Sequence, residues 1–320
     1  MSAETAPTTF YREIDRNRRN SWLLVTAVVI LLGVLGGAIG YATGFGWGGV
    51  VLAVLVAVAL SVGSFFGGDA LVLASSRARE IDVANPPDQF RQLVNVVTEM
   101  RLAGGLPMPR LFVIDDTAPN AFATGRDPKH ASVAVTTGLL EKLDREQLQG
   151  VIAHEMSHIG NYDIRFALLV GVLVGSIALL SDWFLRFTFW GGGRGRDRDG
   201  GGGSAAAILL AVALVLAVVA PIASRLVQLS VNRTRESLAD VSGVELTRNP
   251  VALARALRTI ADDPEVLEAA NRATQHLYVV NPIKSFEERS KSMWDTHPPI
   301  GERIRLLEGL AGRYGAPIGG

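Results

Sequence analysis

The chain has 320 residues, enough for one or two domains, and its 31 basic residues balance 31 acidic ones. This balance leaves no net charge to attract nucleic acid, so no nucleic-acid partner is expected. Absence of cysteine excludes disulfides and thiolate ligands, which leaves His, Asp and Glu to hold any metal ion. Apolar residues make up 48% of the chain and gather in long runs, which indicates an integral membrane protein.

Two apolar segments follow a short polar tail at the amino terminus. Residues 1–20 are rich in arginine, whereas residues 21–68 contain no charged residue and predict a two-helix transmembrane hairpin. Glycines at 44–49 divide the hairpin, and Trp22 and Trp47 stand at the starts of its spans, where interfacial aromatic residues are common. A cleaved signal peptide fits less well, because its apolar region would be only about 7 to 15 residues long.

The first soluble stretch, residues 77–165, predicts a small sheet followed by a helix. Three short runs of strand-forming residues, separated by proline and glycine, are expected as strands: 111–114, 121–124 and 132–136. Asp144 and Gln147 have the spacing of a capping box, which predicts the start of a helix, and apolar residues continue at helical spacing. The segment His154-Glu155-Met156-Ser157-His158 lies on this helix.

The segment from His154 to His158 is the strongest chemical signal in the chain. Histidines four residues apart turn both imidazoles to one face of a helix, as one zinc ion requires, and Glu155 lies beside the metal's open position. Glu155 is therefore expected to act as general base toward water activated by the metal. The alternative is a buried helix with two satisfied histidines. Asp163 could brace a ligand or cap the end of the helix.

Residues 166–226 contain a third and a fourth hydrophobic segment, separated by a loop rich in glycine and arginine at 187–204. The fourth is long enough to cross a bilayer, whereas the third crosses only if it extends to about residue 185; otherwise the two are buried or re-entrant. In either case both soluble stretches lie on one side. Arginines flanking the first hairpin place that side in the cytosol, although the arginines of the loop oppose this orientation.

The second soluble stretch, residues 227–320, supplies the remaining candidates. A catalytic zinc site needs a third protein ligand, and Glu236 is the best candidate because it begins a predicted helix after the fourth hydrophobic segment. Asp240 shares its helical face and could accept the spare N–H of a ligating histidine, although a solvated helix face explains both residues too. His297 could donate to an oxyanion or hold a ligand, although a helix-capping turn at Pro298 also explains it.

Taken together, these segments resemble the HtpX-type membrane zinc metalloproteases, a family related to the eukaryotic CAAX prenyl proteases. The resemblance rests on these motifs: His154 to His158, Asn120 to Arg126, Arg235 to Asp240 with Leu246 to Pro250 after it, and Thr296 to Pro299. It extends from about Arg77 to the carboxyl terminus, and the layout of four hydrophobic segments is similar as well.

The resemblance implies a gluzincin-like site in which His154, His158 and Glu236 bind one zinc ion and Glu155 acts as the catalytic acid and base. It also implies a strand against which an extended substrate peptide pairs, formed by Asn120, Ala121, Phe122 and Ala123. A bacterial cytoplasmic (inner) membrane location, an active site facing the cytosol, and a role in stress response and quality control of membrane proteins are implied as well.

The expected fold is therefore α+β and mainly α: an integral membrane protein with up to four transmembrane helices and a zinc metallopeptidase domain containing a small β-sheet. The leading hypothesis is a membrane-bound zinc endopeptidase that hydrolyses membrane or misfolded proteins at the cytosolic face. Its expected partners are polypeptide substrates and the lipid bilayer. One alternative is a catalytically silent scaffold or adaptor with a protease fold. Another is a protease that cuts within the bilayer, which is disfavoured because the histidine motif precedes the third hydrophobic segment.

Overall fold

The computed structural model describes residues 46–170, 233–265, 267, 278–279 and 299–314, together with isolated positions between 15 and 30. A long helix, α2 (Trp47–Ser75), leads into a layered body. The elements of the body are β1 (Arg79–Ile81), α3 (Arg91–Ala103), β2 (Arg110–Ile114), β3 (Ala121–Gly125), β4 (Ala131–Thr136), α4 (Thr137–Lys142), α5 (Arg145–Gly160), α8 (Arg233–Thr247), α9 (Pro250–Asp262) and α11 (Ile300–Tyr314). Short 3-10 turns lie at Asp88–Phe90 and Pro128–His130. The described body is mainly helical with one small sheet, which confirms this part of the expected fold class.

The sheet is mixed and has the strand order β1-β2-β4-β3, which leaves β3 at an edge. Strand β1 is antiparallel to β2, β2 is parallel to β4, and β3 is antiparallel to β4, with Ala123 opposite Val133. The three strands predicted from the sequence are confirmed to within one residue at each end. Strand β1 was not predicted, because its three residues are too few to show an alternating pattern.

Each face of the sheet packs against a different set of helices. One face joins α3, α5 and α9 in the main hydrophobic core, to which Val133 and Val135 contribute from β4. The opposite face packs against the end of α2 and contributes Phe112, Ile114 and Phe122. Because both faces are covered, all residues of β3 and β4 are buried, and the strands consist of apolar or small residues.

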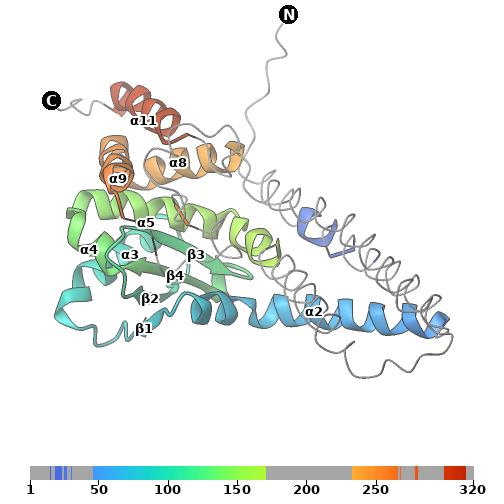
Figure 1. The fold of residues 1–320 in the computed structure, drawn as a ribbon. Helices are drawn as coiled ribbons and strands as arrows, with labels where there is room; N and C mark the ends of the chain where they lie inside the picture. Colours follow the sequence, from blue (N-terminus) through green and yellow to red (C-terminus); the bar gives the residue numbers. More distant parts are fainter. Residues whose placement is uncertain are drawn as a thin grey trace, which may run out of the picture.

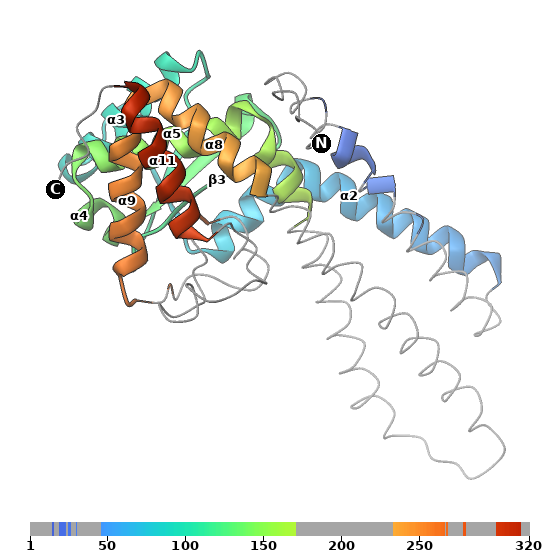
Figure 2. The same cartoon turned by 90° about the horizontal axis from the view of Figure 1, so that it is seen from above.

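Helix α5 lies between the sheet and a second group of helices. Figure 1 shows α8, α9 and α11 on the side of α5 away from the sheet, and Figure 2 shows α11 lying across α8 and α9. The predicted capping box starts α5: Asp144 accepts a hydrogen bond from the backbone N–H of Gln147 at 2.8 Å, and the Gln147 side chain accepts one from the Asp144 N–H at 2.9 Å. This part of the sequence-based prediction is confirmed.

Two glycines let the neighbouring helices approach α5 closely. A Cβ atom on Gly150 of α5 would lie 2.8 Å from the backbone nitrogen of Leu253 in α9. A Cβ atom on Gly243 of α8 would lie 3.1 Å from the backbone nitrogen of His154. The second contact brings α8 against α5 at the histidine motif, so side chains one and two turns earlier in α8 reach the same region.

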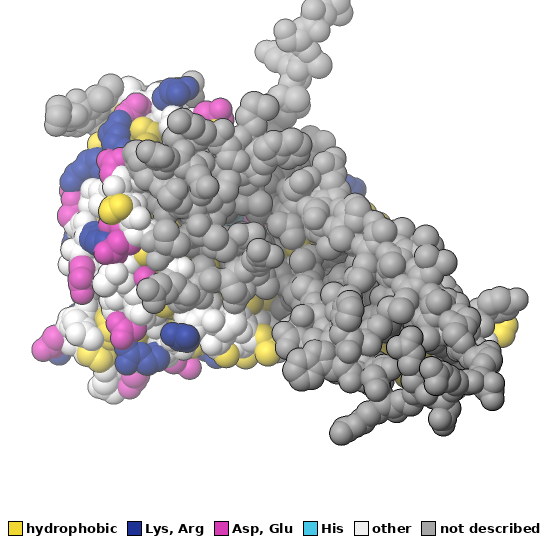
Figure 3. Space-filling view, viewed as in Figure 1, with side chains coloured by type: hydrophobic (Ala, Val, Ile, Leu, Met, Phe, Trp, Pro, Cys, Tyr) yellow, Lys and Arg dark blue, Asp and Glu magenta, His cyan; other side chains and the backbone are white. Residues whose placement is uncertain are grey.

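Helix α2 corresponds to the second predicted span and continues past Gly68 to Ser75. Its apolar side chains are exposed: Trp47 is 84% accessible and Phe66 is 61% accessible. By length and composition, Val50–Ser75 is the one stretch among the described residues that could cross a membrane. On the surface of the body seen in Figure 3, by contrast, basic and acidic side chains are interspersed.

Several predicted segments lie wholly or largely outside the described residues. These are the tail 1–20, the first span of the hairpin 21–68, the segments within 166–226 beyond residue 170, and the loop 187–204. The division of the soluble part into 77–165 and 227–320 stays a prediction. Residues 163–170 are helical, so the third hydrophobic segment begins as a helix directly after the histidine motif.

Candidate metal centre

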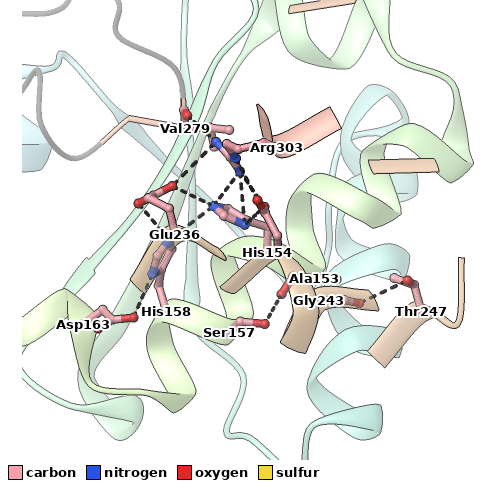
Figure 4. A network of polar contacts seen from close by, with 11 residues as sticks. Ala153, His154, Ser157, His158, Asp163, Glu236, Gly243, Thr247, Val279 and Arg303 are labelled. Carbon is pink, nitrogen blue, oxygen red and sulfur yellow. Dashed lines mark hydrogen bonds and ion pairs between the residues drawn. The ribbon is translucent and has the colours of Figure 1, made fainter. Parts of the chain in front are cut away.

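The structure brings together His154 and His158 of α5 and Glu236 of α8. One nitrogen of each histidine and one carboxylate oxygen all lie within 4.8 Å of one another. The two Nε2 atoms are 3.2 Å apart, and each lies 3.7 Å from an oxygen of Glu236. Figure 4 shows the three side chains pointing toward one another from the two helices. Glu236 therefore meets the histidine pair although it lies 78 positions after His158 in the sequence.

A carboxylate holds the other ring nitrogen of each histidine. Asp240 lies 2.9 Å from Nδ1 of His154, and Asp163 lies 3.0 Å from Nδ1 of His158. A carboxylate acceptor favours a proton on Nδ1, so in the neutral, metal-binding form of each imidazole the lone pair lies on Nε2. Both lone pairs belong to atoms that face the same point. The contact predicted for Asp240 is present, and Asp163 braces His158 in the first of its two proposed roles.

This geometry fits a single divalent metal ion. Tetrahedral coordination with metal–nitrogen bonds of 2.0 to 2.1 Å places two ligand nitrogens about 3.3 Å apart. The observed separation of 3.2 Å agrees with that value, and the carboxylate of Glu236 needs only a small approach to complete a third ligand. Two imidazoles, one carboxylate and no thiolate form a donor set typical of catalytic rather than structural sites.

Arg303 of α11 is a further residue of the centre that the sequence analysis did not single out. It is 2% exposed and donates to the carboxylate of Asp240 through Nε at 2.9 Å and Nη2 at 2.7 Å. Its Nη2 also lies 3.3 Å from Nε2 of His154. Arg303 therefore fixes the carboxylate that fixes the histidine, and it places a positive charge beside the ligand set (Figure 4).

Glu155 is 2% exposed and lies between the ligands and the edge of the sheet. Its carboxylate accepts a hydrogen bond from the backbone N–H of Ala123 in β3. Burial and the negative charge of Glu236 outweigh this bond and the charge of His158, and raise the pKa of Glu155 to about 7. A carboxyl group with this pKa can both accept and release a proton near neutral pH.

Residues 87–311 match the model of peptidase family M48. The chain belongs to this family. Curated relatives include the "Protease HtpX homolog" of Lactiplantibacillus plantarum, which is 42% identical over 94% of this chain and 99% of the relative. The homolog of Levilactobacillus brevis is 43% identical over 93% of this chain and 99% of the relative. That of Dictyoglomus thermophilum is 39% identical over 96% of this chain and 97% of the relative. This M48 chain is therefore an HtpX-type metalloprotease, as the sequence motifs predicted.

A likeness to a solved structure is weaker. The alignment with the crystal structure of S. mikatae Ste24p covers 93% of this M48 chain and 67% of the Ste24p chain, with 16% identity and a TM-score of 0.47.

The two histidines of this M48 site differ in their electrostatic surroundings. Burial and the charge of Arg303 lower the pKa of His154, although Asp240 acts in the opposite direction. Burial would also lower the pKa of His158, but the hydrogen bond with Asp163 and the charge of Glu236 outweigh it and raise the pKa to about 9. In the absence of a cation, His158 therefore binds a proton more tightly than His154 does.

The remaining candidates of this M48 chain fall into two groups. Ala121, Phe122 and Ala123 lie in β3, and buried Asn120 precedes it, with its backbone N–H donating to Oγ1 of Thr136 at 2.9 Å. The backbone N–H of Ala123 bonds to Glu155, so the outer edge of β3 faces this carboxylate. His297 lies outside the described residues, so its role stays a prediction.

One signal could have revealed Arg303: it interrupts an apolar helical stripe that includes Ile300 and Leu307.

Proposed function

We propose that this M48 chain is a zinc-dependent endopeptidase of the bacterial cytoplasmic membrane that cleaves membrane or misfolded proteins at the cytosolic surface. The observation that carries the proposal is the meeting of His154, His158 and Glu236 beside buried Glu155, next to an edge strand. A metal site, a titratable carboxyl group and a surface for an extended peptide thus lie together, as hydrolysis of a polypeptide requires.

In this proposal His154, His158 and Glu236 are the zinc ligands. Two imidazoles and one carboxylate are a usual catalytic zinc set, which leaves one position open. When bound, zinc lowers the pKa of water and polarises a carbonyl oxygen. Asp240 and Asp163 keep the two histidines in the tautomer that can bind the ion, and Arg303 holds Asp240 in place.

Glu155 is proposed to move the proton. Its carboxylate takes a proton from water as the water oxygen bonds to the peptide carbonyl carbon, and it returns the proton to the amide nitrogen as the C–N bond breaks. In the metal-free protein, burial and the charge of Glu236 raise the pKa of Glu155 to about 7, so this carboxyl group can hold or release a proton near neutral pH. His297 is kept as a proposed donor to the oxyanion.

The outer edge of β3 is proposed to bind the substrate by strand addition. Because β3 is an edge strand, an extended peptide can pair with its backbone. The hydrogen bond from the Ala123 N–H to Glu155 places this edge beside the catalytic carboxylate. A peptide on the edge would therefore bring one of its own peptide bonds close to Glu155, which supports cleavage within a chain.

The position of α2 supports an active site near the membrane surface. If Trp47 lies at one interface, a core about 30 Å thick is crossed in about 20 residues, which reaches Phe66. At that level Arg126 lies over the Phe66 ring at 5.3 Å and Arg165 lies over the Phe65 ring at 5.6 Å. Arginine stacked on aromatic rings suits the headgroup layer. The metal centre lies close to this level, because Arg165 is two residues after Asp163 and Asp163 contacts His158.

The proposal is tested with purified full-length protein in liposomes, loaded with zinc and given an unfolded soluble protein and a membrane protein. We expect zinc-dependent cleavage of both and none with Glu155→Gln. Zinc-loaded protein that cleaves neither substrate while a partner co-purifies would favour the scaffold alternative. For orientation, a cysteine introduced at Tyr162 should be labelled only from the cytosolic side; labelling from the opposite side would reject the cytosolic assignment.

A further inference from the structure

Two residues between α9 and α11 lie against the outer edge of β3. The backbone N–H of Val279 donates to the carbonyl oxygen of Ala121 at 3.0 Å. Tyr278 is 1% exposed and Val279 is 3% exposed, so the contact is buried. The chain itself thus supplies a backbone hydrogen bond to the strand edge at which substrate binding is proposed.

Side-chain contacts anchor this dipeptide on both sides. The Tyr278 ring packs edge-on against Phe122 with the ring centroids 4.9 Å apart, and the Tyr278 hydroxyl donates to Oγ of Ser76 at 3.3 Å. On the other side, Arg303 donates through Nη1 to the carbonyl oxygen of Val279 at 3.1 Å. The Val279 backbone therefore bridges β3 and the arginine that holds Asp240 beside the metal ligands.

The bridge lies one pairing position away from the proposed catalytic carboxylate. The Ala121 carbonyl bonds to Val279, and the Ala123 N–H bonds to Glu155. Residues i and i+2 of a strand direct their backbone groups to the same edge and lie about 6.6 Å apart. Figure 4 shows Val279 beside Arg303, close to His154 and Glu236. Val279 thus occupies the space through which a peptide on this edge must pass.

We propose that Tyr278–Val279 occupies one of the backbone-pairing positions that an extended substrate uses on β3, so that the segment and the substrate compete for the edge. This inference rests on the proposed function, which assigns β3 to substrate binding. An incoming strand replaces the Val279 N–H at the Ala121 carbonyl, and Nη1 of Arg303 becomes free to donate to a carbonyl group of the substrate while Nε and Nη2 stay on Asp240. Peptide binding therefore requires the dipeptide to leave, and anything that holds it in place inhibits the enzyme.

The first test locks the segment with a disulfide. The chain has no cysteine, so Ala121→Cys with Val279→Cys introduces a single pair. Both side chains belong to the same buried cluster, and the hydrogen bond from the Val279 N–H to the Ala121 carbonyl brings the two backbones close enough for a disulfide to be attempted. We expect the oxidised zinc-loaded enzyme to cleave an unfolded protein at least about tenfold more slowly than the same sample after reduction. Val279→Cys alone, treated in the same way, is the control and should not respond to oxidation.

The second test releases the segment and measures binding without catalysis. In the Glu155→Gln protein, Val279→Pro removes the N–H donor, whereas Val279→Ala keeps it and is the matched control. We expect Val279→Pro to bind a fluorescent unfolded peptide with a Kd about fivefold lower than the Val279→Ala control, the shift that loss of one neutral hydrogen bond gives.

The two tests separate the competition from the proposed function. Equal cleavage by the oxidised and reduced double variant would overturn the proposed competition. So would a Kd for Val279→Pro that is equal to or higher than the Kd for Val279→Ala. Absence of zinc-dependent cleavage by the wild-type protein would instead reject the proposed function. The binding measurement would then still decide whether the dipeptide and a peptide compete for β3.

Discussion

Two groups of arginine–carboxylate contacts lie at opposite ends of α5 and differ in their exposure to water. Near the carboxyl end, Arg303 and Asp240 form a pair whose side chains are 1% and 0% exposed. Near the amino end, Arg255 and Asp144 pair with side chains that are 46% and 47% exposed. The chemical groups are the same, so the difference lies in their surroundings.

The comparison indicates which charges organise the site. A buried pair has lost its hydration, so each partner depends on the other and on its hydrogen bonds, and removal of one leaves an uncompensated charge. When an exposed pair loses one partner, water replaces the lost contact, so the free energy of unfolding changes little. The buried pair also holds His154 in position, whereas the exposed pair only adds to the capped start of α5.

Removal of the buried cation is expected to have the largest effect on stability. Arg303→Met keeps much of the side-chain volume but leaves the buried Asp240 carboxylate without its cationic partner, so the free energy of unfolding should fall by about 3 to 5 kcal/mol. Zinc affinity should fall too, because Asp240 then orients His154 less well. Urea unfolding and zinc titration measure the two effects. Arg305→Met, at an exposed position of the same helix, should change the free energy of unfolding by less than about 0.5 kcal/mol. Equal effects of the two substitutions would contradict the comparison.

Packing against α5 gives the next largest expected effect. In Gly150→Ala the new Cβ would lie 2.8 Å from the backbone nitrogen of Leu253, so α9 must move, at a cost of about 1 to 3 kcal/mol. Gly309→Ala in α11 meets nothing within 4 Å and should stabilise the helix by about 0.5 to 1 kcal/mol. Thermal unfolding of both variants checks the opposite signs; a stabilised Gly150→Ala protein would show that the close contact between α5 and α9 is not needed.

The pH dependence of zinc binding sharpens the contrast between the two histidines. Despite burial, Asp163 and Glu236 raise the pKa of His158 to about 9, so at neutral pH zinc must displace a proton from this side chain. Zinc affinity should therefore rise by about tenfold per pH unit up to about pH 9. Asp163→Asn removes a cause of the raised pKa and should flatten this dependence above pH 7. Titrations at several pH values measure the slope, and a flat wild-type profile would rule out a protonated His158.

Loss of an exposed ion pair is expected to have the smallest effect. Arg255→Ala removes the contacts with Asp144 and with Glu146, whose side chain is 62% exposed. The free energy of unfolding should change by less than about 1 kcal/mol, and less still at high salt. Zinc content and proteolysis should match the wild type. A loss as large as that of Arg303→Met would mean that exposure does not distinguish the two groups of charges.

Local features of the sequence predicted much of this site. The capping box placed the start of α5, the two-histidine spacing placed both imidazoles on one face, and the i, i+4 spacing of Glu236 and Asp240 placed both on one face of α8. Each of these signals lies within one or two helical turns, where periodicity determines geometry. The three longer strands were also predicted from local signals, because turn residues bound their apolar runs.

Other contacts depend on tertiary packing, and their local signals are weaker or absent. Arg303 reaches Asp240 across 63 positions because α11 packs on α8, and an arginine in an amphipathic helix usually faces water. Asp163 had two reasonable roles until the structure placed it at Nδ1 of His158. The pairing of Val279 with Ala121 was not foreseen, since an apolar dipeptide does not indicate which strand edge it will meet.

The central claim is that His154, His158 and Glu236 bind the metal and that Glu155 moves the proton. It is tested most directly by measuring zinc content and proteolysis together in wild type, Glu155→Gln and Glu236→Ala. We expect Glu155→Gln to keep a full complement of zinc and lose about 100-fold or more in activity, and Glu236→Ala to lose zinc. Full activity in Glu155→Gln would contradict the proposed base, and normal zinc affinity in Glu236→Ala would contradict the third ligand.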